Sequence, residues 1–242
     1  MIKELIRKLL ILLHIDLTKN IKYDRLTLKI LNKVLHRNSN GIDIGCFKGE
    51  ILDEILKRSP SGEHKAFEPV PESYNQLAIK YDQKNVSIYN IALNDKVGVT
   101  TFNYVIGAPA YSGIKKRDYD GKNPEIKVID VKTDTLDNIL SQDYHVDLIK
   151  IDVEGAEFNV LKGAYKTISR CKPVIIFEFG LGASDYYNVT PNDFYEYISN
   201  KCGYEVYLLE SFLKNTSSLS KEKFEDIYNA NKEYYFVASP LK

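Results

Sequence analysis

The 242-residue chain has no tryptophan, a single methionine and only three cysteines. It also lacks an excess of either charge, because 33 basic side chains balance 33 acidic ones. Without a net positive field there is nothing to attract a polyanion, so we expect no nucleic-acid partner. Cys46, Cys171 and Cys202 do not have the spacing of a metal or redox motif, which favours a reducing, cytoplasmic environment.

The N-terminal region lacks an apolar run long enough for a membrane span. Its run of five apolar residues at 9–13 is too short, and no small-residue cleavage site follows it. Apolar side chains at 2, 5, 6, 9 and 13 recur at helical spacing, which predicts an amphipathic helix. We expect residues 1–37 to form a helical extension packed on the main domain or across its active-site mouth. Weak membrane-surface contact through residues 1–20 is the alternative.

Residues 38–242 read as one α/β domain, because short apolar runs alternate with helical patterns. This order predicts a doubly wound, Rossmann-like sheet that is mostly parallel, with an antiparallel edge strand. The seven strands are expected at 42–45, 63–68, 86–91, 146–152, 174–179, 204–210 and 234–238. Expected helices include 49–57, 71–81, 135–140, 155–169 and 191–201. Two more strands, at 99–105 and 126–132, flank the loop 107–123, whose length is typical of a functional segment.

A glycine-containing turn follows the first strand, within the nine residues that run from Gly41 to Gly49. Glycines let the backbone approach a ligand closely, and the following helix offers free N–H groups. The frame is Asp43-x-Gly45-x-x-x-Gly49 rather than the G-x-G-x-x-G of dinucleotide sites, and its acid suits an ammonium better than a pyrophosphate. We therefore favour S-adenosylmethionine as cofactor, with contacts from Asp43, Gly45, Cys46, Phe47 and Gly49.

The ends of the second and third strands supply the other predicted cofactor contacts. Glu68 ends the second strand, where a carboxylate can accept both hydroxyls of a ribose. The end of the third strand lies where an adenine is expected, with packing and backbone contacts as its main role. The predicted contacts from these two strands are Glu68, Pro69, Asn90, Ile91 and Ala92.

Acidic residues gather after the fourth of the seven strands, in Lys150-Ile151-Asp152-Val153-Glu154-Gly155-Ala156-Glu157. Asp152 and Glu154 should face the same crevice as the glycine turn. Glu178 ends the next strand behind an apolar run, where burial can raise a carboxyl pKa toward that of a useful base. The candidate catalytic residues are Asp152, Glu154 and Glu178, with Asp152 also beside the cofactor.

Simpler interpretations of these acids stay open. A charge at a helix N-terminus explains Glu154 and Glu157 well, and Asp152 and Glu178 less well because both end buried strands. Asp152 and Glu178 could also share a divalent cation, but the sequence offers no further ligand set, so we predict no metal.

Together these motifs resemble the FkbM family of methyltransferases over about residues 40–210. The most specific part is the string Lys150 to Glu157, accompanied by Asp43 to Gly49, Phe67-Glu68-Pro69, Ile91-Ala92-Leu93, Thr135-Leu136-Asp137 and Phe177-Glu178. The resemblance implies a class I methyltransferase fold and transfer of a methyl group from S-adenosylmethionine to a hydroxyl of a sugar, glycan or polyketide-like acceptor. It leaves the acceptor and the oligomeric state open.

Two other functional classes remain as alternatives. A nicotinamide-dependent oxidoreductase is disfavoured by the glycine frame and by the lack of an evident Tyr-x-x-x-Lys pair or catalytic histidine. A non-catalytic module recruited to a membrane would keep the fold, with the N-terminal helix carrying the function.

Overall fold

The computed structural model describes residues 17–82, 84–119 and 123–241. The amphipathic helix predicted within residues 2–13, and most of the segment predicted to touch a membrane, lie outside these ranges. Within them, no helix has both the length and the apolar character needed to cross a bilayer.

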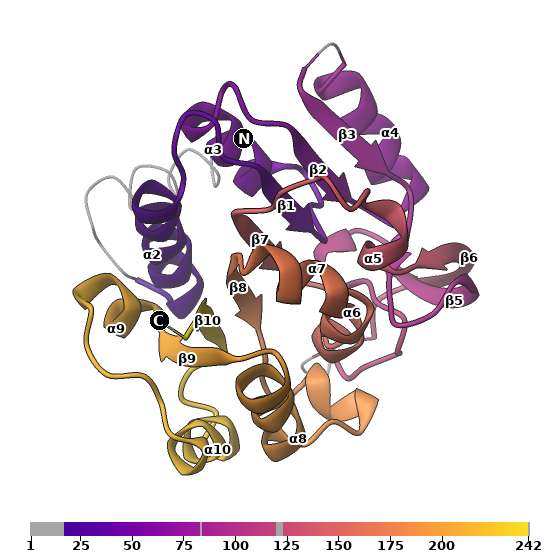
Figure 1. Cartoon of the computed structure of the whole chain (residues 1–242). Helices are drawn as coiled ribbons and strands as arrows, with labels where there is room; N and C mark the ends of the chain where they lie inside the picture. Colours follow the sequence, from indigo (N-terminus) through magenta and orange to yellow (C-terminus); the bar gives the residue numbers. More distant parts are fainter. Residues whose placement is uncertain (1–16, 83, 120–122, 242) are drawn as a thin grey trace.

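The centre of the molecule is a seven-stranded, mostly parallel sheet, as predicted (Figure 1). Its strand order is β3-β2-β1-β7-β8-β10-β9. The predicted position of the antiparallel strand needs a correction, because β10 pairs antiparallel with both β8 and β9, and β9 forms the edge. The strands are β1 (Gly41–Ile44), β2 (His64–Phe67), β3 (Val86–Tyr89), β7 (Leu148–Ile151), β8 (Val174–Glu178), β9 (Tyr204–Leu208) and β10 (Tyr235–Pro240).

Helices cover both faces of this sheet. One face buries Leu148, Ile176 and Val237 against helix α2, and Ala66 against α3 and α4. The other buries Ile149, Ile175 and Phe236 in a larger core with the remaining helices. The first group is α2 (Lys19–Val34), α3 (Glu50–Arg58), α4 (Pro71–Lys80) and α9 (Leu209–Lys214); the second is α5 (Leu136–Ile139), α6 (Glu157–Gly163), α7 (Tyr165–Cys171), α8 (Pro191–Glu196) and α10 (Lys221–Asn229).

Several helices differ from the sequence prediction. The helix expected over 155–169 is two helices, α6 and α7, that meet at Ala164. The helix expected over 191–201 is α8 followed by a π-helical turn, η3 (Tyr197–Lys201). Helices α9 and α10 lie between the last two predicted strands, where no helix was predicted. The buried residues Phe224, Ile227 and Tyr228 of α10 have a helical spacing that indicates this helix.

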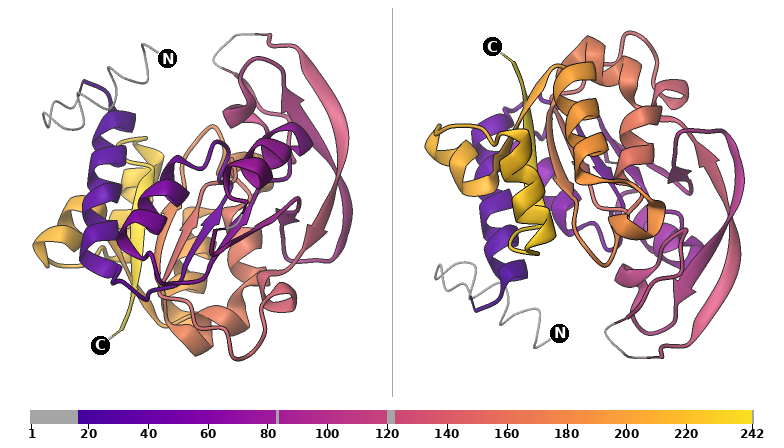
Figure 2. Two further views of the ribbon diagram at one scale, coloured as in Figure 1. Left: turned by 90° about the horizontal axis from the view of Figure 1, so that it is seen from above. Right: turned by 90° about the horizontal axis from the view of Figure 1, so that it is seen from below.

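The strands that interrupt the alternation form a separate three-stranded sheet, which the sequence did not predict. Its order is β4-β6-β5, and β5 pairs antiparallel with β6 from Gly98↔Thr133 to Val105↔Ile126. The strands are β4 (Ala92–Leu93), β5 (Gly98–Val105) and β6 (Ile126–Asp134), and the short turn η1 (Pro109–Tyr111) follows β5. Figure 2 shows the β5–β6 ribbon curving along the side of the molecule opposite α2.

Candidate active site

The acidic residues predicted for the site are brought together by strand register. Asp43 pairs with Ala66 and Lys150, Lys150 with Ile176, and Ile176 with Val237, so this row lies on one face of the sheet. Because side chains alternate between faces, the residue two positions further toward the carboxyl ends of β7 and β8 returns to that same face. Asp152 and Glu178 therefore lie next to each other on the face covered by α2 and α3.

The glycine turn has the backbone that its glycines allow. Gly45 has φ +78°, and a Cβ atom there would lie 1.8 Å from the carbonyl oxygen of Asp152. The N–H groups of Gly45 and Cys46 both donate to the carbonyl oxygen of Phe67, at 3.0 and 3.2 Å. Gly49 has φ +74° and is the N-cap residue of α3. The turn therefore brings the ends of β1, β2 and β7 closer together than a side chain at Gly45 would permit.

Glu68 is held by backbone donors from two directions. Its Oε2 accepts the N–H of Phe47 and its Oε1 accepts the N–H of Val70, both at 2.9 Å. Burial raises the pKa of Glu68 to about 7, even though these two hydrogen bonds favour ionisation. Each carboxylate oxygen keeps a further lone pair, so Glu68 can still accept two hydroxyl groups. The amide of Asn90 donates at 2.9 Å to the carbonyl oxygens of Glu68 and Pro69, which fixes the end of β2.

A pocket with about 570 Å³ of space free of protein atoms, open solvent included, lies at this edge of the sheet. The predicted residues that line it are Gly45, Phe47, Glu68, Pro69, Ile91, Ala92, Asp152 and Glu154. The predicted residues Asp43, Cys46, Gly49, Asn90 and Glu178 are not on its wall. A third side of the pocket is made by Phe102 of β5 and by Pro109, Ala110, Ser112 and Ile114. The last four lie in the loop 107–123, whose length predicted a functional segment, but no sequence pattern marked these residues individually.

Asp43 is buried in the sheet rather than exposed in the pocket. It is 1 % exposed, and neither carboxylate oxygen has a hydrogen-bond partner. Burial raises the pKa of Asp43 to about 6, against the attraction of the Lys150 ammonium, its partner in strand register. The structure thus places the Asp43 carboxylate within the sheet, beside the buried Lys150 and away from the pocket wall.

Asp152 is the most strongly anchored acid of the site. Its Oδ2 accepts the Lys150 ammonium at 2.8 Å and also the hydroxyl of Tyr235. Burial disfavours its charge, but Lys150 and these hydrogen bonds outweigh that effect and hold the pKa of Asp152 below its usual range. Burial and the nearby Asp152 charge raise the pKa of Glu178 well above its usual range, and the two carboxyl groups hydrogen bond to each other. Asp152 is consequently the ionised member of the pair.

Glu154 and Glu157 have separate structural roles. Glu154 has φ +59° and forms an ion pair with Arg117, whose side chain is 7 % exposed. Burial, followed by repulsion from Asp152, raises the pKa of Glu154 to about 8. Oε1 of Glu157 accepts the N–H groups of Val153 and Gly155, at 3.0 and 3.2 Å, so this side chain holds the turn between β7 and α6.

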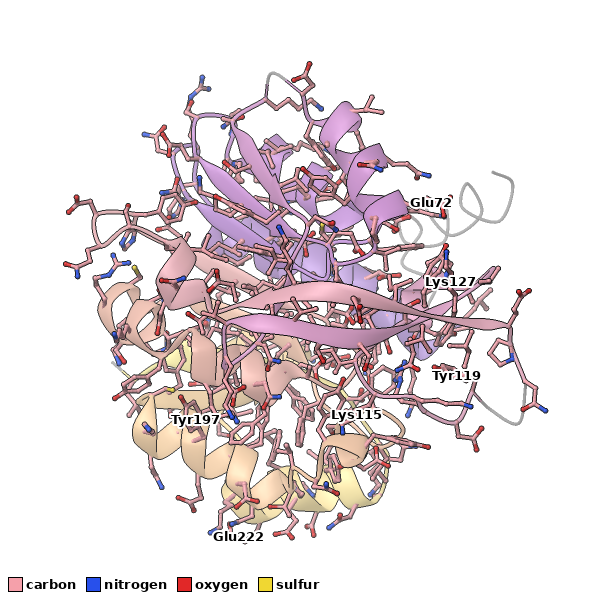
Figure 3. All side chains as sticks on the ribbon, turned by 90° about the vertical axis from the view of Figure 1, so that its right-hand side faces the viewer. Glu72, Lys115, Tyr119, Lys127, Tyr197 and Glu222 are labelled. Carbon is pink, nitrogen blue, oxygen red and sulfur yellow. The ribbon has the colours of Figure 1, made fainter. Side chains whose placement is uncertain are left out.

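Arg117 ties the segment after β5 to the far side of the pocket. Besides Glu154, its guanidinium donates to the carbonyl oxygens of Gly182 and Tyr111, both at 3.2 Å. The N–H of Lys115 donates to the hydroxyl of Tyr187 at 3.2 Å, and the N–H of Asp118 to the hydroxyl of Tyr186 at 2.9 Å. Figure 3 views this side of the molecule, with Lys115 and Tyr119 below the β5–β6 ribbon.

The acids were also compared with the arrangement that a metal ion requires, within the described part of the chain. Across residues 17–82, 84–119 and 123–241, no group of three or more histidine, cysteine, aspartate or glutamate side chains is arranged to hold an ion. Asp152 and Glu178, the pair considered for a shared cation, are joined by a hydrogen bond.

The residues present fit S-adenosylmethionine. Gly45 lines the pocket, and its close approach to the Asp152 carbonyl leaves no room for a side chain there, while Glu68 retains acceptor capacity for a ribose. Ile91 and Ala92 provide apolar surface at the position expected for an adenine.

Comparison with known proteins identifies the family of this chain and relates its fold to solved structures. The sequence model described as "Methyltransferase FkbM domain" matches residues 43–206, and no curated protein matches the chain. The crystal structure of methyltransferase FkbM from Methylobacillus flagellatus KT is similar over 85 % of this chain, at 15 % identity and a TM-score of 0.52. This chain spans 44 % of the length of that protein. A TehB-like methyltransferase from Corynebacterium glutamicum is similar over 90 % of this chain and 88 % of its own, at 10 % identity and a TM-score of 0.47.

The fold is the class I methyltransferase fold. Within that class, the chain belongs to the FkbM methyltransferase family, whose domain matches more than half of its residues.

The substitution Gly45→Ala should weaken binding of S-adenosylhomocysteine by about tenfold or more, because the added methyl group forces β1 and the Asp152 carbonyl apart. Gly203→Ala is the matched control: Gly203 has a similar φ of +75° but its Cβ would meet only the end of Lys172 at 3.4 Å. Both variants should unfold at lower temperature than wild type, and only Gly45→Ala should lose affinity in calorimetric titration. Equal affinities in the two variants would contradict a role of the Gly45 turn in binding the cofactor.

Binding of S-adenosylhomocysteine should also depend on pH through Glu68. Its pKa of about 7 means that the carboxyl is protonated below neutral pH and ionised above it, and the ionised form accepts two hydroxyls. We expect affinity to fall about tenfold from one pH unit above this pKa to one unit below it. Calorimetry on Glu68→Gln should show weak binding and an affinity that changes less with pH. If the affinity of this variant changed with pH as steeply as that of wild type, the pH dependence would belong to another group.

Proposed function

We propose that this protein transfers a methyl group from S-adenosylmethionine to a hydroxyl of a small-molecule or glycan acceptor, of sugar or polyketide-like type. The family supports methyl transfer. The observation that carries the choice of a hydroxyl is Asp152, an ionised carboxylate on the wall of the same pocket as Gly45 and Glu68. A hydroxyl must lose its proton as it gains a methyl group, and such a carboxylate can accept that proton.

Each part of the site has a defined task in this reaction. The glycine turn and Glu68 hold and orient the donor, which supplies an electrophilic methyl group on a positively charged sulfur. With the donor bound there, the acceptor oxygen would take the methyl group that the sulfur releases, and Asp152 would accept the hydroxyl proton. Holding the reactants in line supplies much of the acceleration.

Between the two candidate bases, the geometry favours Asp152 over Glu178. Asp152 lines the pocket and has a lowered pKa, whereas Glu178 is off the pocket wall and has a strongly raised one. A carboxyl that already holds its proton cannot accept another, so Glu178 stabilises Asp152 through their hydrogen bond. Glu154, on the wall and paired with Arg117, orients the acceptor side.

The segment from Pro109 to Asp118 is the part that we expect to select the acceptor. It lines the pocket at Pro109, Ala110, Ser112 and Ile114. Its backbone also donates hydrogen bonds to the hydroxyl groups of Tyr186 and Tyr187. Exposed aromatic faces such as that of Tyr111, which is 54 % exposed, suit sugar rings.

The proposed function is tested by incubating the protein with methyl-labelled donor and a panel of sugars, glycans and polyketide-like alcohols. Mass spectrometry should find one acceptor that gains a methyl group on oxygen. Methylation confined to nitrogen or carbon, or transfer of hydride from a nicotinamide cofactor instead, would refute it.

On that acceptor, Asp152→Asn should lower the turnover number by about 10²–10⁴-fold, because the amide cannot accept the proton. Glu178→Gln is the matched control, an amide of similar shape on the neighbouring strand, and should stay within about tenfold of wild type. Affinity for S-adenosylhomocysteine, measured alongside, separates loss of chemistry from loss of cofactor. Wild-type turnover in both variants would rule out this assignment of the base.

A further inference from the structure

Tyr235 reaches the site from outside the matched family domain. It is the first residue of β10, beyond the matched range 43–206, and its hydroxyl donates to Oδ2 of Asp152. Strand β10 runs antiparallel to β8, and Tyr235 pairs with Glu178. The direction of β10 therefore brings the start of that strand, rather than its end, to the edge where β7 and β8 end.

The ring of Tyr235 is held in turn by the N-terminal helix. Tyr23 of α2 is 4 % exposed and stacks on Tyr235, with ring centroids 5.1 Å apart and an interplanar angle of 24°. The Tyr23 hydroxyl donates to Glu233 and accepts the N–H of Tyr234 at 3.3 Å. Lys22 adds an ion pair to Glu233 at 3.2 Å. Helix α2 thus clamps the chain where β10 begins.

Two donors on one oxygen restrict the Asp152 side chain. The Lys150 ammonium comes from within β7, and the Tyr235 hydroxyl from across β8, and both bond to Oδ2. Loss of either donor removes one of the contacts that hold the carboxylate in a single side-chain rotamer. The orientation of the carboxylate toward the pocket therefore depends on a residue of β10 and on the helix behind it.

We propose that Tyr235 is a positioning residue for methyl transfer, which orients the Asp152 carboxylate, and that Tyr23 of α2 holds Tyr235 in place. This inference rests on the proposed function, in which Asp152 accepts the proton. It gives the helix that precedes the matched domain a role in the reaction.

The charged and titratable groups around Asp152 come from four strands, one turn and the start of one helix. They are Asp43 on β1, Lys150 on β7, Glu154 and Glu157 in the turn after β7 and at the start of α6, Glu178 on β8 and Tyr235 on β10. Removing the Tyr235 hydroxyl changes one hydrogen bond and leaves all of the charges in place.

The test compares Tyr235→Phe with Tyr234→Phe. Tyr234 precedes β10 and its hydroxyl bonds to Asn20 near the start of α2, so the control also loses a hydroxyl contact with the N-terminal helix but none with Asp152. The Asp152 carboxyl is followed in ¹³C-aspartate-labelled full-length protein, and its signal is assigned with Asp152→Asn. In Tyr235→Phe its titration midpoint should rise by about one pH unit, and in Tyr234→Phe it should stay at the wild-type value.

A pair of substitutions at Tyr23 tests the clamp. Tyr23→Phe keeps the stacked ring and should leave the Asp152 midpoint near wild type, whereas Tyr23→Leu removes the ring and should raise it.

With the acceptor found in the screen above, Tyr235→Phe should lower the turnover number about tenfold at unchanged affinity for S-adenosylhomocysteine, and the acid limb of the pH–rate profile should move to higher pH.

An unchanged Asp152 midpoint in Tyr235→Phe overturns the inference, as does wild-type turnover in a variant whose midpoint has moved. If no compound is methylated on oxygen, the proposed function fails, and the carboxyl titration still decides whether Tyr235 anchors Asp152.

Discussion

The site depends on one buried cation, the ammonium of Lys150. The residue is 6 % exposed, and although burial lowers its pKa, the carboxylates of Asp152 and Asp43 more than offset this and raise it to about 12. A buried charge without a partner would cost several kcal/mol. The charge of Lys150 is therefore stable only while its two carboxylate neighbours are present. The same cation holds the pKa of Asp152 down, whereas burial and the Asp152 charge raise the pKa of the neighbouring Glu178, and this difference favours Asp152 as the base.

The alternation of side chains across the sheet explains why these groups meet. Asp43, Lys150, Asp152, Glu178 and Tyr235 all lie on the face covered by α2 and α3, because strand register and the two-residue period leave no other arrangement. Helix α2 is part of the same apolar core as Leu148, Ile176 and Val237. The segment before the matched domain and the strand after it therefore complete one structural unit around the acids.

The sequence predicted what is local and periodic, and missed what depends on distant pairing. The alternation of strands and helices, the sharp turn at Gly45 and the place of Glu68 at a strand end all follow from short-range patterns. The β4-β6-β5 sheet, the pairing of Arg117 with Glu154 and the hydroxyl of Tyr235 join residues far apart in the chain, and no short-range pattern encodes such partners. Asp43 was predicted to face the cofactor. The alternation of side chains along β1 instead places it beside Lys150 of the neighbouring strand β7.

A crystal structure of the complex with S-adenosylhomocysteine tests the central claim most directly. The account predicts that both ribose hydroxyls lie within hydrogen-bond distance of the Glu68 carboxylate, that the backbone at Gly45 contacts the amino-acid part, and that the sulfur faces Asp152. A ligand bound with its ribose away from Glu68, or with Asp152 on the opposite side of the pocket from the sulfur, would contradict it.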